Sequence, residues 1–125
     1  MGFDQYHEPP DELPTGTRTF ARICASLTEE AEAIGWYEQR IAVEPDPEAV
    51  AVMRNAQMEE FKHFSMDLEF LLRRAPLWRE IAAAILFAPG DIVAAGDEAE
   101  AEAGEEAPVA VAGSLGIGSL RGEAL

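Results

Sequence analysis

The chain has 125 residues, so it forms one domain at most, near the lower end of the lengths that bury a core alone. Its 24 Asp and Glu against 9 Lys and Arg give a net charge of −15, which excludes nucleic acids and anionic membrane surfaces as favourable partners and favours cations. We therefore expect the chain to associate with further copies of itself.

Residues 1–14 are expected to be a disordered N-terminus. They are acidic and lack the basic-then-apolar layout of a signal peptide. The longest uncharged run, residues 107–120, is too short to span a bilayer. The single cysteine, Cys24, excludes an intrachain disulfide and is interpreted as a small buried apolar residue. These features predict a soluble, cytoplasmic protein.

Residues 15–88 are predicted to form the folded domain, which begins with a long helix from about Thr15 to Val43. Seven positions repeat with alternating steps of three and four residues, which is typical of the seam of a packed helix. These positions are Phe20, Ile23, Leu27, Glu30, Ile34, Tyr37 and Ile41.

A second helix is predicted from Pro47 to about Arg74, with Asp46 as its N-cap. Because the connection is so short, this helix should run antiparallel to the first. One stripe on it comprises Ala49, Met53, Ala56, Glu60, His63 and Phe70, and a second comprises Phe61, Phe64, Leu68 and Leu71. The first helix alone does not cover both stripes of the second, so we expect each hairpin to pack against at least two others. The simpler alternative is that the second helix is an unusually apolar helix within an ordinary helical bundle.

The rest of the chain is expected to hold one short helix and a tail. The helix covers about residues 76–87 and ends at Pro89 and Gly90. Residues 89–112 are rich in acids and have no Lys or Arg, which indicates a flexible acidic linker. Residues 113–125, GSLGIGSLRGEAL, contain too much glycine for a helix but could place Leu115, Ile117 and Leu120 in pockets of a partner.

Three polar residues interrupt the apolar seam at one level. Glu30 lies 13 residues before Val43, and Glu60 lies 14 residues after Asp46, so in an antiparallel hairpin both carboxylates come roughly 20 Å from the turn. His63 follows Glu60 by three residues and leaves the same face of the helix. Buried carboxylates must be protonated, paired or bound to a cation.

A metal ion is the interpretation that best explains this cluster. Carboxylate oxygens with one imidazole nitrogen suit iron or manganese, and zinc less well. A Glu–His ion pair retained for specificity, or a seam that is simply exposed, are the alternatives. A di-iron site of the ferritin-like type uses two Glu and two Glu-x-x-His sets, of which this chain has half. A second copy related by a two-fold axis would supply the other half.

The sequence resembles the encapsulated ferritin family over about residues 15–88. The resemblance is carried by EEAEAIGWYEQR (residues 29–40), EEFKH (residues 59–63) and LEFLLRR (residues 68–74). It implies an all-α, ferritin-like two-helix hairpin with a short third helix, whose four-helix bundle is completed by dimerisation. It also implies a ring of ten subunits inside an encapsulin nanocompartment, with residues 113–125 similar to an encapsulin-targeting peptide.

The resemblance also implies roles for individual residues. Glu30, Glu60 and His63 would bind a di-iron centre beside Tyr37, and Glu29, Glu32 and Trp36 would lie at an outer site for a divalent cation. Without the resemblance, these last four residues read as solvated charges and packing aromatics.

The expected function is that of a ferroxidase that oxidises iron(II) with dioxygen or peroxide and stores the product inside the shell. A di-iron peroxidase or oxidase related to rubrerythrin is an alternative, although one cysteine excludes a Cys₄ electron-transfer site. A metal-free helical adaptor in the shell is another.

Overall fold

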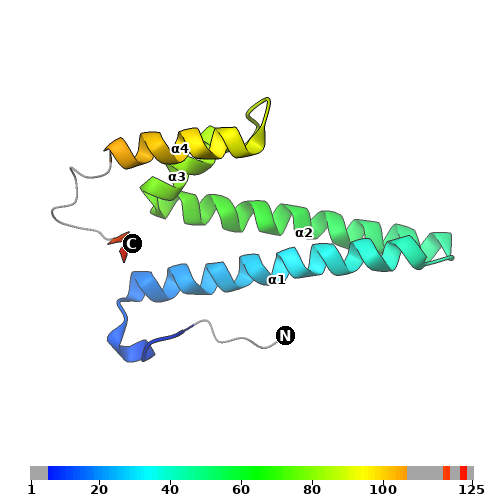
Figure 1. Cartoon of the computed structure of the whole chain (residues 1–125). Coiled ribbons are helices and arrows are strands. Elements are labelled where there is room, and N and C mark those ends of the chain that lie inside the picture. The colour runs from blue at the N-terminus through cyan, green and yellow to red at the C-terminus, as the bar shows by residue number, and fades with distance from the viewer. Residues whose placement is uncertain (1–5, 107–116, 119–121, 124–125) are drawn as a thin grey trace. The chain divides into compact units, whose positions relative to one another are not determined.

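The computed structural model describes residues 6–106, 117–118 and 122–123. It divides into two compact units, Met1–Leu71 and Leu72–Leu125. The described residues are helical apart from one short strand pair, which confirms the all-α class (Figure 1). In this part of the chain no helix combines the length and the apolar composition needed to cross a membrane.

The first unit begins with a 3-10 helix, η1, over Pro10–Glu12. Backbone hydrogen bonds from Glu12 N to Pro9 O (2.9 Å) and from Leu13 N to Pro10 O (3.1 Å) hold this turn. The prediction that residues 1–14 are disordered is therefore wrong for residues 10–12, because proline fixes the backbone in a conformation that favours the turn. Residues 1–5 lie outside the described residues.

Two long helices make up most of the first unit: α1 spans Thr15–Val43, and α2 spans Pro47–Arg74 and ends just beyond the unit. Both ranges agree with the sequence prediction. Asp46 caps α2, since its Oδ1 accepts hydrogen bonds from the backbone N–H groups of Glu48 (2.9 Å) and Ala49 (3.4 Å). The short connection turns α2 back beside α1, and the two form an antiparallel hairpin (Figure 1).

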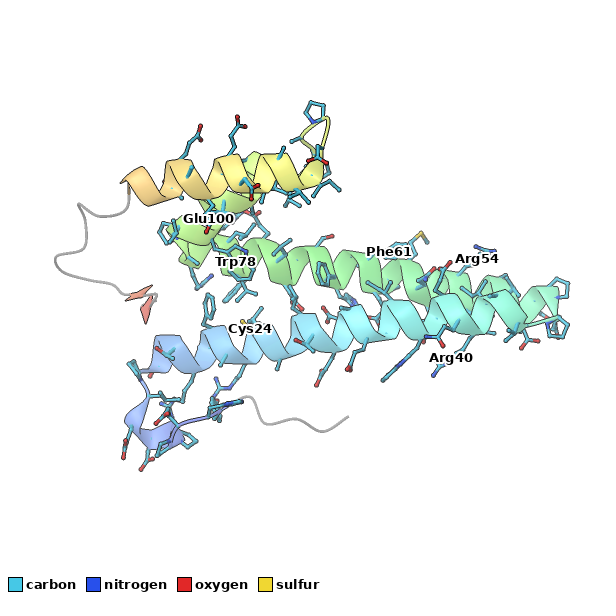
Figure 2. The ribbon with its side chains drawn as sticks, viewed as in Figure 1. Cys24, Arg40, Arg54, Phe61, Trp78 and Glu100 are labelled. Carbon is cyan, nitrogen blue, oxygen red and sulfur yellow. The ribbon has the colours of Figure 1, made fainter. Side chains whose placement is uncertain are left out.

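One polar side chain ties the two helices together. The Gln57 side chain on α2 is 7% exposed, and its Nε2 donates to the Ile34 carbonyl oxygen (3.1 Å) and to Glu38 Oε1 (3.0 Å) on α1. Such buried side-chain hydrogen bonds specify the register between α1 and α2. Figure 2 shows Cys24 on the side of α1 that faces α2, where burial raises the pKa of its thiol.

The seam of the hairpin is only half covered. All seven seam positions of α1 and all six positions of the first α2 stripe are half-buried. In the second stripe Leu71 is fully buried, whereas Phe61 (labelled in Figure 2) remains 49% exposed. Trp36, Val52, Met58 and Met66 also expose large apolar surfaces. A single chain therefore leaves much of its apolar surface in water.

The second unit contains α3 (Pro76–Ile85) and α4 (Ile92–Glu106), which pack against each other. The chain leaves α3 earlier than Pro89, because Leu86 is extended and Phe87 has a φ of 66°. The flexible linker predicted for residues 89–112 is wrong for residues 92–106, which form α4. Residues 107–112 lie outside the described residues.

Local chemistry explains why α4 forms despite its charge. The backbone N–H of Ala94 donates to Asp91 Oδ2 (2.9 Å), as at a helix N-cap. Alanine, the best helix former, recurs through α4, and Ala99 and Ala103 are buried on one face. A side chain at Gly96 would come within 3.9 Å of Ile85 Cδ1, so α3 and α4 approach closely there. Small residues at this spacing allow the helices to pack.

The C-terminal segment shows one local pairing. Strand β1 (Ile117–Gly118) pairs antiparallel with β2 (Gly122–Glu123), with Ile117 opposite Glu123. The rest of the predicted targeting segment, residues 113–125, lies outside the described residues.

Candidate metal centre

The hairpin brings together the three polar residues that interrupt its seam. One ligand atom each from Glu30 on α1 and from Glu60 and His63 on α2 lie within 4.8 Å of one another. Within the described ranges, this is the one group of three or more His, Cys, Asp or Glu side chains with such geometry. The predicted convergence at one level follows from the antiparallel pairing. The role of these residues as iron ligands stays a prediction.

The imidazole is positioned by its own helix. His63 Nδ1 lies 3.5 Å from Glu60 Oε1 and Nε2 lies 4.0 Å from Glu59 Oε1, so both nitrogens face carboxylates. Lys62 points to a different face and binds Glu59 (2.9 Å), which lowers the pKa of that carboxyl. Lys62 is therefore paired with Glu59 and not with Glu60.

The electrostatics of Glu30 show an excess of negative charge. Burial, a hydrogen bond with Asp67, and the charges of Asp67, Glu60 and Glu29 raise the pKa of Glu30 to about 7 from its ordinary value of 4.5. With both carboxyls ionised, the buried atoms Glu30 Oε1 and Asp67 Oδ2 have no donor among the described residues, so the hydrogen bond between the two side chains needs a proton on one of them. Two ionised carboxylates only accept hydrogen bonds, so a proton or a cation must lie between them.

The donor set fits a transition-metal ion. Two carboxylates and an imidazole, half-buried and short of positive charge, match the ligands that iron and manganese accept. The buried oxygen of Glu30 that lacks a partner is the atom that a cation would satisfy. One hairpin supplies only three such ligands, which leaves positions for a second chain.

Asp67 is the acidic residue that sequence reasoning missed. It follows Glu60 by seven residues and His63 by four, which places it on the same face of α2. Asp67 also occupies the position of the first α2 stripe between His63 and Phe70, and this three-and-four spacing was the signal that could have found it. The contact with Glu30 from the other helix becomes visible only in the folded hairpin.

The remaining predicted site residues differ in their exposure. Tyr37 is half-buried in the seam, with Arg40 Cζ 5.4 Å from its ring centroid, a cation–π geometry. Glu29 and Glu32 are exposed, and Trp36 is 48% exposed. Only Glu29 acts on the cluster, through its charge on Glu30. The outer site and the role of Tyr37 stay predictions.

The raised pKa of Glu30 makes metal-free protein less stable at neutral than at mildly acidic pH. Between 4.5 and about 7 the folded state binds more protons than the unfolded state, so the free energy of unfolding falls as the pH rises through this window. Melting of metal-free protein at about pH 5 and about pH 7.5 should show a larger loss in wild type than in Glu30→Gln. An identical pH dependence in both proteins would contradict this assignment.

An antiparallel hairpin that gathers Glu, Glu and His in a half-covered seam defines a ferritin-like helical protein with a candidate metal centre. The EncFtn-like family model matches residues 5–89. The chain therefore belongs to the EncFtn-like family, as its resemblance to encapsulated ferritins predicted.

Individual relatives agree with this assignment. An encapsulated ferritin-like protein of Rhodospirillum rubrum is 43% identical over 94% of this chain and 89% of the relative. A ferritin-like protein of Thermotoga maritima is 38% identical over 94% of this chain and 98% of its own length. A crystal structure of a protein from Nitrosomonas europaea matches with a TM-score of 0.69 and 36% identity, and covers 71% of this chain and 98% of that chain.

Proposed function

We propose that the protein is a ferroxidase that binds iron(II) at Glu30, Glu60 and His63 and releases iron(III). The observation that carries this proposal is the cluster of three ligand atoms within 4.8 Å, in a member of the EncFtn-like family. The surplus of negative charge around Glu30 favours a cation there. Iron(II) is the substrate, and dioxygen or peroxide takes up its electrons.

The complete centre would be formed by two chains. A two-fold axis beside the cluster would join two copies of Glu30, Glu60 and His63 into a di-iron site. The half-covered seam supports this arrangement, because the same contact would bury the apolar positions that one chain leaves exposed. In the ten-subunit ring that the family resemblance implies, Glu29, Glu32 and Trp36 would meet another subunit and bind a second divalent cation.

The protein side of the chemistry is binding and charge. The carboxylates hold two positive ions close together, and their negative charge stabilises the more highly charged product relative to iron(II). Each iron loses one electron, so a pair supplies the two electrons that convert dioxygen to peroxide or peroxide to water. Tyr37, in the same seam, would lie beside the pair of ions.

The product would be stored outside the subunit, inside an encapsulin shell. In the described residues the hairpin of α1 and α2 leaves its seam half-exposed and so would not enclose mineral by itself, and the Rhodospirillum rubrum relative is described as encapsulated. Residues 113–125 would bind the shell through Leu115, Ile117 and Leu120.

Metal-driven association tests the shared centre. Adding iron(II), zinc or cobalt(II) to dilute metal-free protein should increase its mass, because metal that binds across the two-fold axis stabilises the dimer by mass action. Light scattering measures this, with His63→Ala as the variant that should not respond. A mass that stays that of one chain at every metal concentration would exclude the shared site. Protein that oxidises iron(II) no faster than buffer alone, with either dioxygen or peroxide, would exclude the ferroxidase.

A further inference from the structure

The cluster has a fourth side chain with ligand chemistry, Asp67. It is half-buried on the face of α2 that carries Glu60 and His63, and it faces Glu30 across the hairpin. We propose that Asp67 is a further metal ligand on the Glu30 side of the centre, so that each chain presents three carboxylates and one imidazole. This inference rests on the proposed function, since it requires that Glu30, Glu60 and His63 bind a metal.

The burial of two particular oxygens supports the assignment. Glu30 Oε1 on α1 and Asp67 Oδ2 on α2 are both excluded from solvent, and no donor among the described residues pairs with either oxygen when both carboxyls are ionised. Buried acceptors in native proteins are nearly always satisfied by a donor, water or an ion. The two oxygens come from different helices, and Glu30 is one of the three residues whose ligand atoms lie within 4.8 Å of one another, so a cation bound by Glu30 would also face Asp67.

The charged groups that raise the pKa of Glu30 are all acids. Among the described residues these are Asp67, Glu60 and Glu29. Lys62, the lysine between Glu60 and His63 in sequence, is paired with Glu59 at 2.9 Å. The positive charge between Glu30 and Asp67 is therefore either a proton, which the raised pKa of Glu30 allows in metal-free protein, or a bound cation.

The chemistry of the added ligand predicts a change in metal preference. His63 supplies the one nitrogen of the set, the donor that zinc favours, whereas Glu30 with Asp67 is an all-oxygen pair that suits harder ions such as manganese(II). A ligating Asp67 should favour manganese(II) over zinc. A carboxylate that acts only through its charge should favour both ions by a similar factor.

Calorimetric titration of full-length protein with manganese(II) and with zinc, for wild type and Asp67→Asn, separates these cases. Loss of an outer-shell partner alone typically costs about 10- to 100-fold in metal affinity, so loss of a ligand in Asp67→Asn should lower the affinity for manganese(II) at least about tenfold. The affinity for zinc should fall clearly less. Glu48→Gln is the matched control: it removes the same charge from an exposed position of α2, about 18 Å along the helix from Glu60, and should bind both ions like wild type.

Metal-free Asp67→Asn should melt at or above the wild-type temperature, because the substitution removes charge repulsion between residue 67 and Glu30. A lower melting temperature would mark Asp67 as a structural residue and overturn the inference. Equal losses for the two ions, or no loss for either, would also overturn it while the proposed function stood. Wild type that binds neither ion, with no difference from Glu60→Ala, would instead contradict the proposed function itself.

Discussion

Replacing Glu60 or His63 with alanine should reduce iron(II) oxidation to the uncatalysed rate. Each substitution removes one of the three ligands that lie within 4.8 Å, and a two-fold axis doubles the loss in the complete centre. The formation of iron(III), followed by absorbance after anaerobic protein and iron(II) are exposed to oxygen, measures the effect. Unchanged turnover in both variants would remove the di-iron assignment.

The same variants should remain folded. Glu60 is half-buried and adds to the negative charge around Glu30, so its removal relieves repulsion in metal-free protein. We therefore expect metal-free Glu60→Ala to melt no lower than wild type. Glu48→Gln, at the exposed first turn of α2, should keep both its activity and its stability.

Deleting residues 113–125 should leave iron oxidation intact and prevent co-purification with a co-expressed encapsulin. Glu30, Glu60 and His63 all lie in the first unit, well before this segment, so neither the hairpin nor its chemistry should depend on it. Shell binding would instead depend on Leu115, Ile117 and Leu120. Each buried aliphatic side chain contributes on the order of 1–2 kcal/mol, and several segments on one ring would add through effective concentration.

Two further proteins make this experiment specific. The double substitution of Ile117→Asp with Leu120→Asp should reproduce the deletion, because charges would have to enter apolar pockets. Residues 113–125 fused to an unrelated soluble protein should carry that protein into the shell. A truncated chain that is still encapsulated at the normal level would disprove the targeting role.

The amino-acid sequence alone determined the hairpin and the level of its polar cluster. The three-and-four spacing from Phe20 to Ile41, and the Asp46 cap followed by Pro47, are local signals, and the bounds of α1 and α2 agree with them. Once the connection is short, antiparallel pairing follows, and simple counting brings Glu30 level with Glu60. These features depend on residues close together in sequence.

The tertiary structure decided what depends on contacts between distant residues. Helix α4 is so acidic that its composition indicates a linker, yet Ala99 and Ala103 are buried and Gly96 allows the close approach of α3. Likewise, the sequence places Asp67 on the face of α2 that carries Glu60 and His63. Only the packing of α1 against α2 brings Glu30 against Asp67 and raises the pKa of Glu30 to about 7. Composition and spacing describe each helix separately, whereas burial and charge repulsion arise when two helices meet.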